Sequence, residues 1–408
     1  MTVALDGGAT SAKPEAAGRP GPDPRVVVPA ALLLFGGALA LSASVGWRLA
    51  ALYLVGGALG LVLYHAAFGF TGSWRRFVAE GRGAGLRAQM VMLALTSAIF
   101  LPVLASGSLF GQSVGGALAP VGLSVAVGAC LFGVGMQLGG GCASGTLFAL
   151  GGGSTRMLIT LVFFMAGSVI GTAHLPWWLD APSLGTISLA RNFGWTPALA
   201  LQLGLFALIA LATVVIERRR HGGLEPIARP GEGAARFLQG PWPLLWGGLL
   251  LALLNVATLA LAGHPWTVSF GYTLWGAKAA GTLGVDLASW PFWTWRFPKS
   301  ALEGSLFANT TSVMNFGIIV GALLAAGLAG RFAPARRVPL GPAAAAALGG
   351  LLMGYGARLA FGCNVGAYFS GIASGSLHGW LWLATALIGT YLGIRLRPAF
   401  GLERRRPS

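Results

Sequence analysis

The stretch GVGMQLGGGCASG, residues 133–145, ends a long apolar run and places a cysteine behind three glycines. The chain has only three cysteines, and glycine is poorly suited to the interior of a helix. A second stretch, GYGARLAFGCNVG, occupies residues 354–366. Both fit the pattern G-x-G-x6-C-x2-G, which aligns Cys142 with Cys363 and Gly145 with Gly366. The chain therefore carries the same glycine–cysteine motif twice.

The composition is that of a membrane protein, with 55% hydrophobic and only 9% charged residues. Apolar runs recur along the chain, each long enough to cross a hydrocarbon core of about 30 Å. We predict an all-α polytopic membrane protein with about ten spans. The predicted spans are residues 27–45, 49–67, 86–106, 116–138, 155–174, 197–216, 242–263, 309–330, 342–361 and 379–397.

The net charge of +16 follows from arginines that gather at the ends of spans. On a soluble protein this charge would suggest nucleic acid, but in a membrane protein basic loops set the orientation. Arginines precede the first span, follow spans two, six and eight, and close the chain. We therefore predict a multi-pass protein of the inner (plasma) membrane, with both termini in the cytoplasm and no nucleic-acid partner.

These features divide the chain into five regions. They are a disordered N-terminal tail at 1–25, a first transmembrane repeat at 26–216, a basic cytoplasmic loop at 217–241, a second transmembrane repeat at 242–397 and a basic C-terminal tail at 398–408.

A further pair of motifs supports the repeat. FGFT at 68–71 follows the second span, and FGYT at 270–273 follows the seventh, so each half carries its two motifs in the same order. Five spans separate corresponding points, and an odd number means that the second half enters the membrane in the opposite orientation. The sequence thus predicts two inverted repeats.

The segments that follow the two cysteines, ASGTLFALGGG and NVGAYFSGIASG, are too short to cross the membrane. We predict that both are re-entrant Gly–Cys loops, because non-helical backbone at membrane depth needs protein or a water-filled cavity around it. The two loops would bring Cys142 and Cys363 to either side of one constriction, which disfavours a permanent disulfide between them. Cys130 lies within a span, where cysteine more often serves as a small packing residue.

At these residues the sequence resembles the YeeE/YedE family of sulfur-transport membrane proteins, whose characterised members import thiosulfate. The resemblance is strongest at residues 65–77, 133–164 and 354–380. It implies that the thiols of Cys142 and Cys363 hand the anion along the path. Importers of the family have a further functional cysteine near the FGFT motif, where this chain has Thr71 and Ser73. Either a hydroxyl replaces that thiol or the substrate differs.

The chemistry of the residues is compatible with an anion path. Free backbone N–H groups at the N-termini of broken helices attract anions, and neutral thiols add weak donors that release them again. Lys278 follows Phe270 by eight residues and is the basic residue that we place at depth. The candidate path residues are Cys142, Cys363, Cys130, Gly141, Gly145, Gly362, Gly366, Thr71, Thr273 and Lys278.

Other classes of function are less well supported. All acidic residues fall in predicted connections, including Glu80 and Glu217, so the sequence offers no carboxylate proton relay. The histidine spacing matches no metal or haem site, so we predict no metal, no cofactor and no enzyme activity.

Two alternatives stay open at this stage. One is a membrane thiol enzyme, a sulfurtransferase or disulfide-exchange protein that uses Cys142 or Cys363 covalently. The other is a pore for a neutral solute or a selenium compound. The family resemblance also implies a small cytoplasmic sulfur-carrier protein as a partner, which the basic loop could attract.

Overall fold

The computed structural model describes residues 21–225, 235–335 and 337–402. Most of the two predicted tails and part of the basic loop therefore lie outside the described residues. Within the described part, ten helical segments are long and apolar enough to cross a membrane. This confirms the predicted all-α membrane protein with ten spans.

The regular elements of the first half are helices and two short antiparallel pairs of strands. Its helices are α1 (Pro24–Ser44), α2 (Trp47–His65), α3 (Phe70–Glu80), α4 (Ala84–Ser106), α5 (Leu123–Gly139), α6 (Ala143–Gly151), α7 (Thr155–Leu179), α8 (Leu189–Phe193) and α9 (Trp195–His221). Strand β1 (Ser108–Leu109) pairs antiparallel with β2 (Gln112–Ser113), and β3 (Pro120–Gly122) pairs antiparallel with β4 (Ser183–Thr186).

The second half is helical throughout its regular elements. They are α10 (Ala235–Gln239), α11 (Leu244–Ala262), α12 (Ser269–Thr282), α13 (Pro291–Thr294), α14 (Arg296–Glu303), η1 (Leu306–Ala308), α15 (Thr310–Leu328), α16 (Leu340–Leu359), η2 (Asn364–Phe369), α17 (Ser370–Ala373), α18 (Leu377–Leu396) and η3 (Arg397–Phe400).

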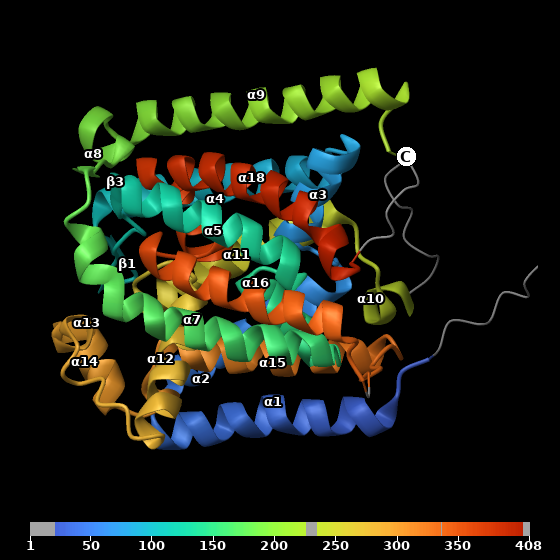
Figure 1. Ribbon diagram of the computed structural model, residues 1–408, viewed down its shortest axis with the longest axis vertical. Coiled ribbons are helices and arrows are strands. Elements are labelled where there is room, and N and C mark those ends of the chain that lie inside the picture. Colours follow the sequence, from blue (N-terminus) through green and yellow to red (C-terminus); the bar gives the residue numbers. More distant parts are fainter. Residues whose placement is uncertain (1–20, 226–234, 336, 403–408) are drawn as a thin grey trace, which may run out of the picture.

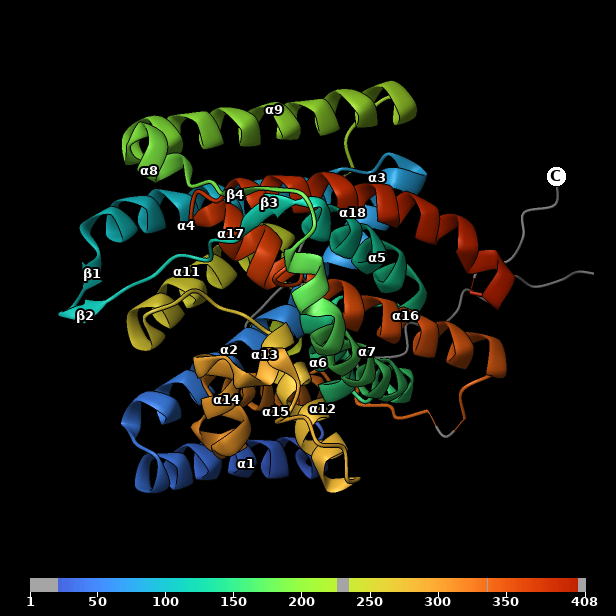
Figure 2. The ribbon, with the colours of Figure 1, turned by 60° about the vertical axis from the view of Figure 1, so that its left-hand side comes forward.

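Two of the long helices lie on the outside of the bundle. Helix α9 runs along one face and α1 along the opposite face in both views (Figures 1 and 2). Only 17% of the most apolar stretch of α9 and 22% of that of α1 are buried, against 67% for α15. Apolar side chains on the outside of a membrane protein face lipid, so α1 and α9 are peripheral helices. The helices between these two form the buried core.

Glycines let the central helices approach one another closely. A side chain at Gly128 of α5 would lie 2.7 Å from the carbonyl oxygen of Gly356, and one at Gly135 would lie 2.7 Å from that of Gly349. Backbones can meet in this way only where no Cβ intervenes, as is common between membrane helices. Since the contact partner moves backwards on α16 as the residue number rises on α5, the two helices run antiparallel.

The contacts of the two motifs correspond to one another. Gly133 packs on the backbone of Ala386 in α18, and Gly354, the aligned glycine, packs on the backbone of Phe164 in α7. Helix α5 thus contacts α18, and α16 contacts α7, while α2 packs on α15 and α4 on α11. Two repeats of opposite orientation would make this set of contacts. Their orientation in the membrane stays a prediction.

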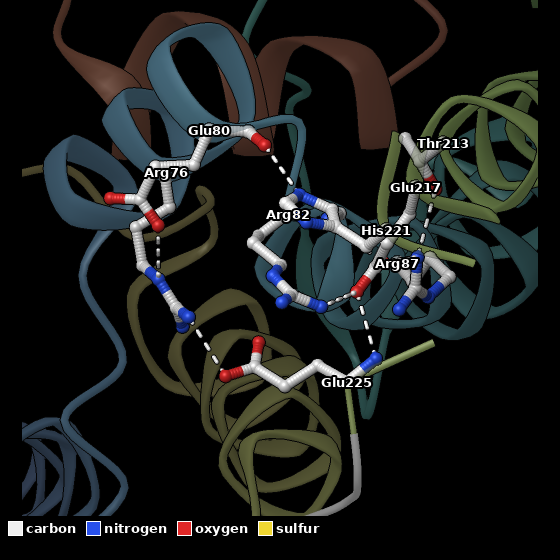
Figure 3. Close-up of polar contacts among 9 residues, drawn as sticks. Arg76, Glu80, Arg82, Arg87, Thr213, Glu217, His221 and Glu225 are labelled. Carbon is white, nitrogen blue, oxygen red and sulfur yellow. Dashed lines mark hydrogen bonds and ion pairs between the residues drawn. The ribbon is translucent and has the colours of Figure 1, made fainter. Parts of the chain in front are cut away.

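A cluster of charged residues fastens the outer helix α9 to the turn between α3 and α4 (Figure 3). The buried carboxylate of Glu217 accepts from Arg87 at 2.8 Å and from the backbone N–H groups of Gly83 and Glu225 at 3.1 and 2.9 Å. Arg82 lies 3.5 Å from the same carboxylate. A buried carboxylate needs such partners to offset its lost hydration.

The placement of Glu217 corrects one expectation. Glu217 lies in α9 just before its last turn, since the helix continues to His221, and Glu80 is the last residue of α3, so neither lies in a connection. The helix ends only after three arginines and a histidine, at Gly222 with a left-handed backbone. Basic residues favour the negative end of a helix dipole, so this sequence extends the helix beyond its apolar part.

Candidate substrate path at the paired cysteines

The first glycine–cysteine motif forms a break between two helices. Helix α5 ends at Gly139 and is capped by Gly140, whose backbone is left-handed with φ of 88°, and α6 begins at Ala143. Cys142 occupies the N-cap of α6 and is 1% exposed. Its Sγ accepts from the N–H of Gly145 at 3.4 Å and lies 3.4 Å from Ser144 Oγ. The motif thus holds a buried thiol at the start of a nine-residue helix.

The second motif makes the same break with a different backbone. Helix α16 ends at Leu359, and the chain turns through Phe361 and Gly362, with φ of 55° and 155°. Cys363 precedes η2, a π-helix of six residues that continues into α17. The Cys363 side chain is fully buried. Gly366 lies beside Thr267, which precedes α12.

The structure brings the two cysteine segments together. Helix α6 contacts η2, and both cysteines belong to the same apolar cluster. Tyr272 of α12, a residue of the FGYT motif, donates from its hydroxyl to the carbonyl oxygen of Ala143 at 2.8 Å. All three cysteines are free thiols.

The FGFT motif reaches the same cluster from α3. Thr71 is buried and its carbonyl oxygen accepts from Gln137 Nε2 at 3.3 Å, while its hydroxyl has no partner among the described residues. The ring of Phe70 meets that of Tyr368 in η2 edge to face, with centroids 5.9 Å apart. The N-terminal turns of α3, α6 and α12 therefore all meet the buried cluster that contains the thiols.

Three of the candidate residues have other surroundings. Cys130 lies in α5, twelve residues before Cys142 in the sequence. Its backbone packs against Gly389 of α18. The hydroxyl of Thr273 donates to the carbonyl oxygen of Ser269 at 3.1 Å, within α12 itself. Lys278 is half-buried and donates from Nζ to the carbonyl oxygen of Leu302 at 2.7 Å, which links α12 to α14. None of these contacts involves Cys142 or Cys363.

A family model described as sulphur transport matches residues 65–392. The chain belongs to this family. The match covers both glycine–cysteine motifs and both FG[FY]T motifs, and it confirms the family resemblance that the motifs suggest. The ten apolar helical segments of the described part fit a multi-pass membrane protein of this family.

Several relatives of this sulphur-transport protein are named as transporters. The protein named "Probable transporter YedE" of Escherichia coli is 31% identical over 164 residues, which are 39% of this chain and 39% of that protein. The thiosulfate transporter TsuA of Spirochaeta thermophila is 28% identical over 295 residues, 65% of this chain and 74% of the relative. The thiosulfate transporter TsuA of Escherichia coli is 25% identical over 350 residues, which are 83% of this chain and 91% of the relative.

Sequence reasoning missed four buried polar residues in this region of the sulphur-transport protein. They are Gln89, Tyr272, Asn364 and Tyr368. Tyr272 lies inside the FGYT motif and Asn364 directly follows Cys363, so their places in the sequence could have marked them as candidate site residues. Gln89 is a carboxamide in an otherwise apolar span, and polar residues in spans often mark a pathway.

Described residues contain no group of three histidine, cysteine or acidic side chains that could hold a metal ion.

Proposed function

We propose that this protein imports thiosulfate, or a closely related sulfur oxyanion, through a path that passes between Cys142 and Cys363. The observation that carries the proposal is the meeting of α6 and η2, the two segments headed by these cysteines, inside one apolar cluster. The two relatives named as thiosulfate transporters support the choice of substrate.

The N-termini of α3, α6 and α12 supply positive potential in this region. The first backbone N–H groups of a helix lack intrahelical partners, and the helix dipole adds a partial positive charge there. The Gly145 N–H already points at the Cys142 sulfur. An anion replacing or joining that contact would be held without any full positive charge, and weak binding of this kind allows release.

The thiols suit a soft anion. A neutral S–H group is a weak donor, and its sulfur is also a weak acceptor, so each thiol can exchange contacts with thiosulfate at little cost. One thiol on each side of a constriction provides two successive contacts. The inverted repeat would present these contacts to the two sides of the membrane in turn.

We further propose the inner membrane as the location, with both termini in the cytoplasm. The arginines at the end of α9 and in the turn between α3 and α4 support this orientation, because the contact between Arg82 and Glu217 holds these two basic segments side by side (Figure 3). The basic segment 217–241 would then face the cytoplasm, where an acidic sulfur-carrier protein could dock and receive the imported sulfur.

Uptake of ³⁵S-thiosulfate into proteoliposomes tests the proposal. The Cys142→Ser and Cys363→Ser variants should each reduce uptake at least tenfold, because serine replaces the soft sulfur with a harder, more tightly solvated oxygen. Cys130→Ser is the matched control, since Cys130 packs against α18, and it should keep near-normal uptake.

Mass spectrometry of each cysteine after transport separates this function from a thiol enzyme. The proposal predicts no persulfide or mixed disulfide on Cys142 or Cys363 during turnover. A stable sulfur adduct on either residue, or full uptake by both serine variants, would contradict the proposal.

A further inference from the structure

Gln89 is a buried carboxamide at the point where α3, α4 and η2 meet. Its side chain is fully buried. Trp74 of α3 donates from Nε1 to Gln89 Oε1 at 3.0 Å, and the Tyr368 hydroxyl of η2 lies 3.3 Å from the same oxygen. The carboxamide thus connects the FGFT helix to the helix that follows Cys363.

These contacts fix which way the carboxamide points. An indole N–H can only donate, so the Gln89 atom that faces Trp74 must be the oxygen. The Nε2 group therefore lies on the side of the carboxamide away from Trp74, and a flip that exchanged Oε1 and Nε2 would break the bond from Trp74. Held in this way, Nε2 presents its two N–H donors away from Trp74.

Neither Trp74 nor any other described residue accepts a hydrogen bond from Gln89 Nε2. A buried donor without an acceptor is unfavourable, and such groups in native proteins usually serve a ligand, an ion or a water molecule. Because only donors are unsatisfied at Gln89, the complementary ligand is one that accepts and need not donate. An oxyanion has this property.

Gln89 is also close to the proposed path. The N–H of Tyr368, whose hydroxyl contacts Gln89, donates to the carbonyl oxygen of Cys363 at 3.4 Å. The Thr71 hydroxyl and the Asn364 carboxamide, in the flanking segments, are buried and likewise lack partners among the described residues. Unsatisfied polar groups thus occur at Gln89 and, directly after Cys363, at Asn364, beside a cluster that is otherwise apolar.

We propose that Gln89 contacts the transported anion, donating from Nε2 to one of its oxygen atoms, and so favours oxyanions at the Cys363 side of the path. The inference rests on the proposed function. It assigns selectivity to a neutral donor rather than to a charged residue, and a neutral donor holds an anion without trapping it.

Kinetics of ³⁵S-thiosulfate uptake into proteoliposomes test this role. Gln89→Met has a similar length but no donor, and we expect its half-saturation concentration to rise roughly 10- to 100-fold. The matched control is Gln202→Met in the outer helix α9, since Gln202 is also fully buried with no partner for its carboxamide among the described residues. The control should stay within about twofold of the wild type.

A second variant guards against a folding defect. Gln89→Glu keeps an oxygen for Trp74 and Tyr368 but presents at most one donor when protonated and none when ionised. The melting profiles of both variants show whether each is folded, and a folded Gln89→Glu protein should still show the raised half-saturation concentration. A folded Gln89→Met or Gln89→Glu protein with wild-type half-saturation would overturn the inference about Gln89 alone. Absence of thiosulfate uptake by the wild-type protein would instead overturn the proposed function.

Discussion

The two glycine–cysteine segments share one sequence pattern but differ in backbone conformation. In the first, the left-handed position before the cysteine is Gly140, and a regular α-helix follows. In the second, the aligned left-handed position is Phe361, and a π-helix follows. Left-handed backbone costs a residue with a side chain about 1–2 kcal/mol, whereas glycine adopts it freely. The second segment is therefore strained where the first is relaxed.

The side chains differ in the same direction. The Cys142 sulfur accepts from Gly145 N–H and has the Ser144 hydroxyl nearby. The Cys363 sulfur likewise has the backbone N–H of Gly366 beside it but no hydroxyl, since Asn364 and Val365 stand where the first segment has Ala143 and Ser144. The buried Asn364 carboxamide has no partner in the described part of the chain.

Strained backbone and π-helical turns are concentrated at functional sites, where the surrounding structure maintains them. We infer that the first segment mainly holds its neighbours in position, whereas the second offers polar groups that a ligand can bind. If so, substitutions at corresponding places in the two segments should have unequal effects.

The largest difference should appear at the glycine before each cysteine. A side chain at Gly362 would lie 2.7 Å from the backbone nitrogen of Ala367, with φ of 155°, whereas the nearest atom to one at Gly141 is 3.2 Å away. Gly362→Ala should lower the free energy of unfolding by about 3 kcal/mol and abolish uptake. Gly141→Ala should lower it by about 1 kcal/mol and retain uptake. Unfolding in detergent and uptake assays measure both, and equal losses would remove the proposed asymmetry.

A smaller difference should separate the two buried tyrosines. Tyr272→Phe removes a 2.8 Å bond to the carbonyl of Ala143 and should destabilise the protein by about 1 kcal/mol. Tyr368→Phe removes a 3.3 Å bond to Gln89 Oε1, which keeps its bond from Trp74, so the loss should stay below about 0.5 kcal/mol. Unfolding curves of the two variants test the order, and a larger loss for Tyr368→Phe would reverse it.

The smallest effect should come from exchanging the residues two positions after each cysteine. Ser144→Val removes the hydroxyl that lies 3.4 Å from the Cys142 sulfur, and Val365→Ser offers a hydroxyl near Cys363. Because hydrogen bonds to thiols are weak, we expect each variant to change the half-saturation concentration of uptake by less than about threefold. A tenfold change in either would mean that the hydroxyl itself is part of the path.

Much of the fold could be predicted because it depends on composition. Long apolar runs mark the spans, and the spacing of the G-x-G-x6-C-x2-G motif identifies corresponding points of the two halves. The packing role of Gly133 and Gly354 also follows from the motif once the halves are aligned, because each meets the long helix that follows the cysteine segment of the other half.

Other features depend on contacts between distant segments and could not be predicted. The partners of Gln89 lie 15 and 279 residues away along the chain, so no local pattern shows that its oxygen is bound and its nitrogen is not. Glu217 was placed in a connection because α9 loses its apolar character there, yet partners from the α3–α4 turn and from the chain after α9 keep it in a helix. The π-helix after Cys363 has no signature in the sequence.

A structure of the protein determined by cryo-electron microscopy with thiosulfate tests the central claim most directly. The account predicts density for the anion within hydrogen-bond distance of the sulfur atom of Cys142 or Cys363, between α6 and η2. Thiosulfate bound elsewhere along the transport path, with both sulfur atoms still enclosed in unchanged helix packing, would contradict it.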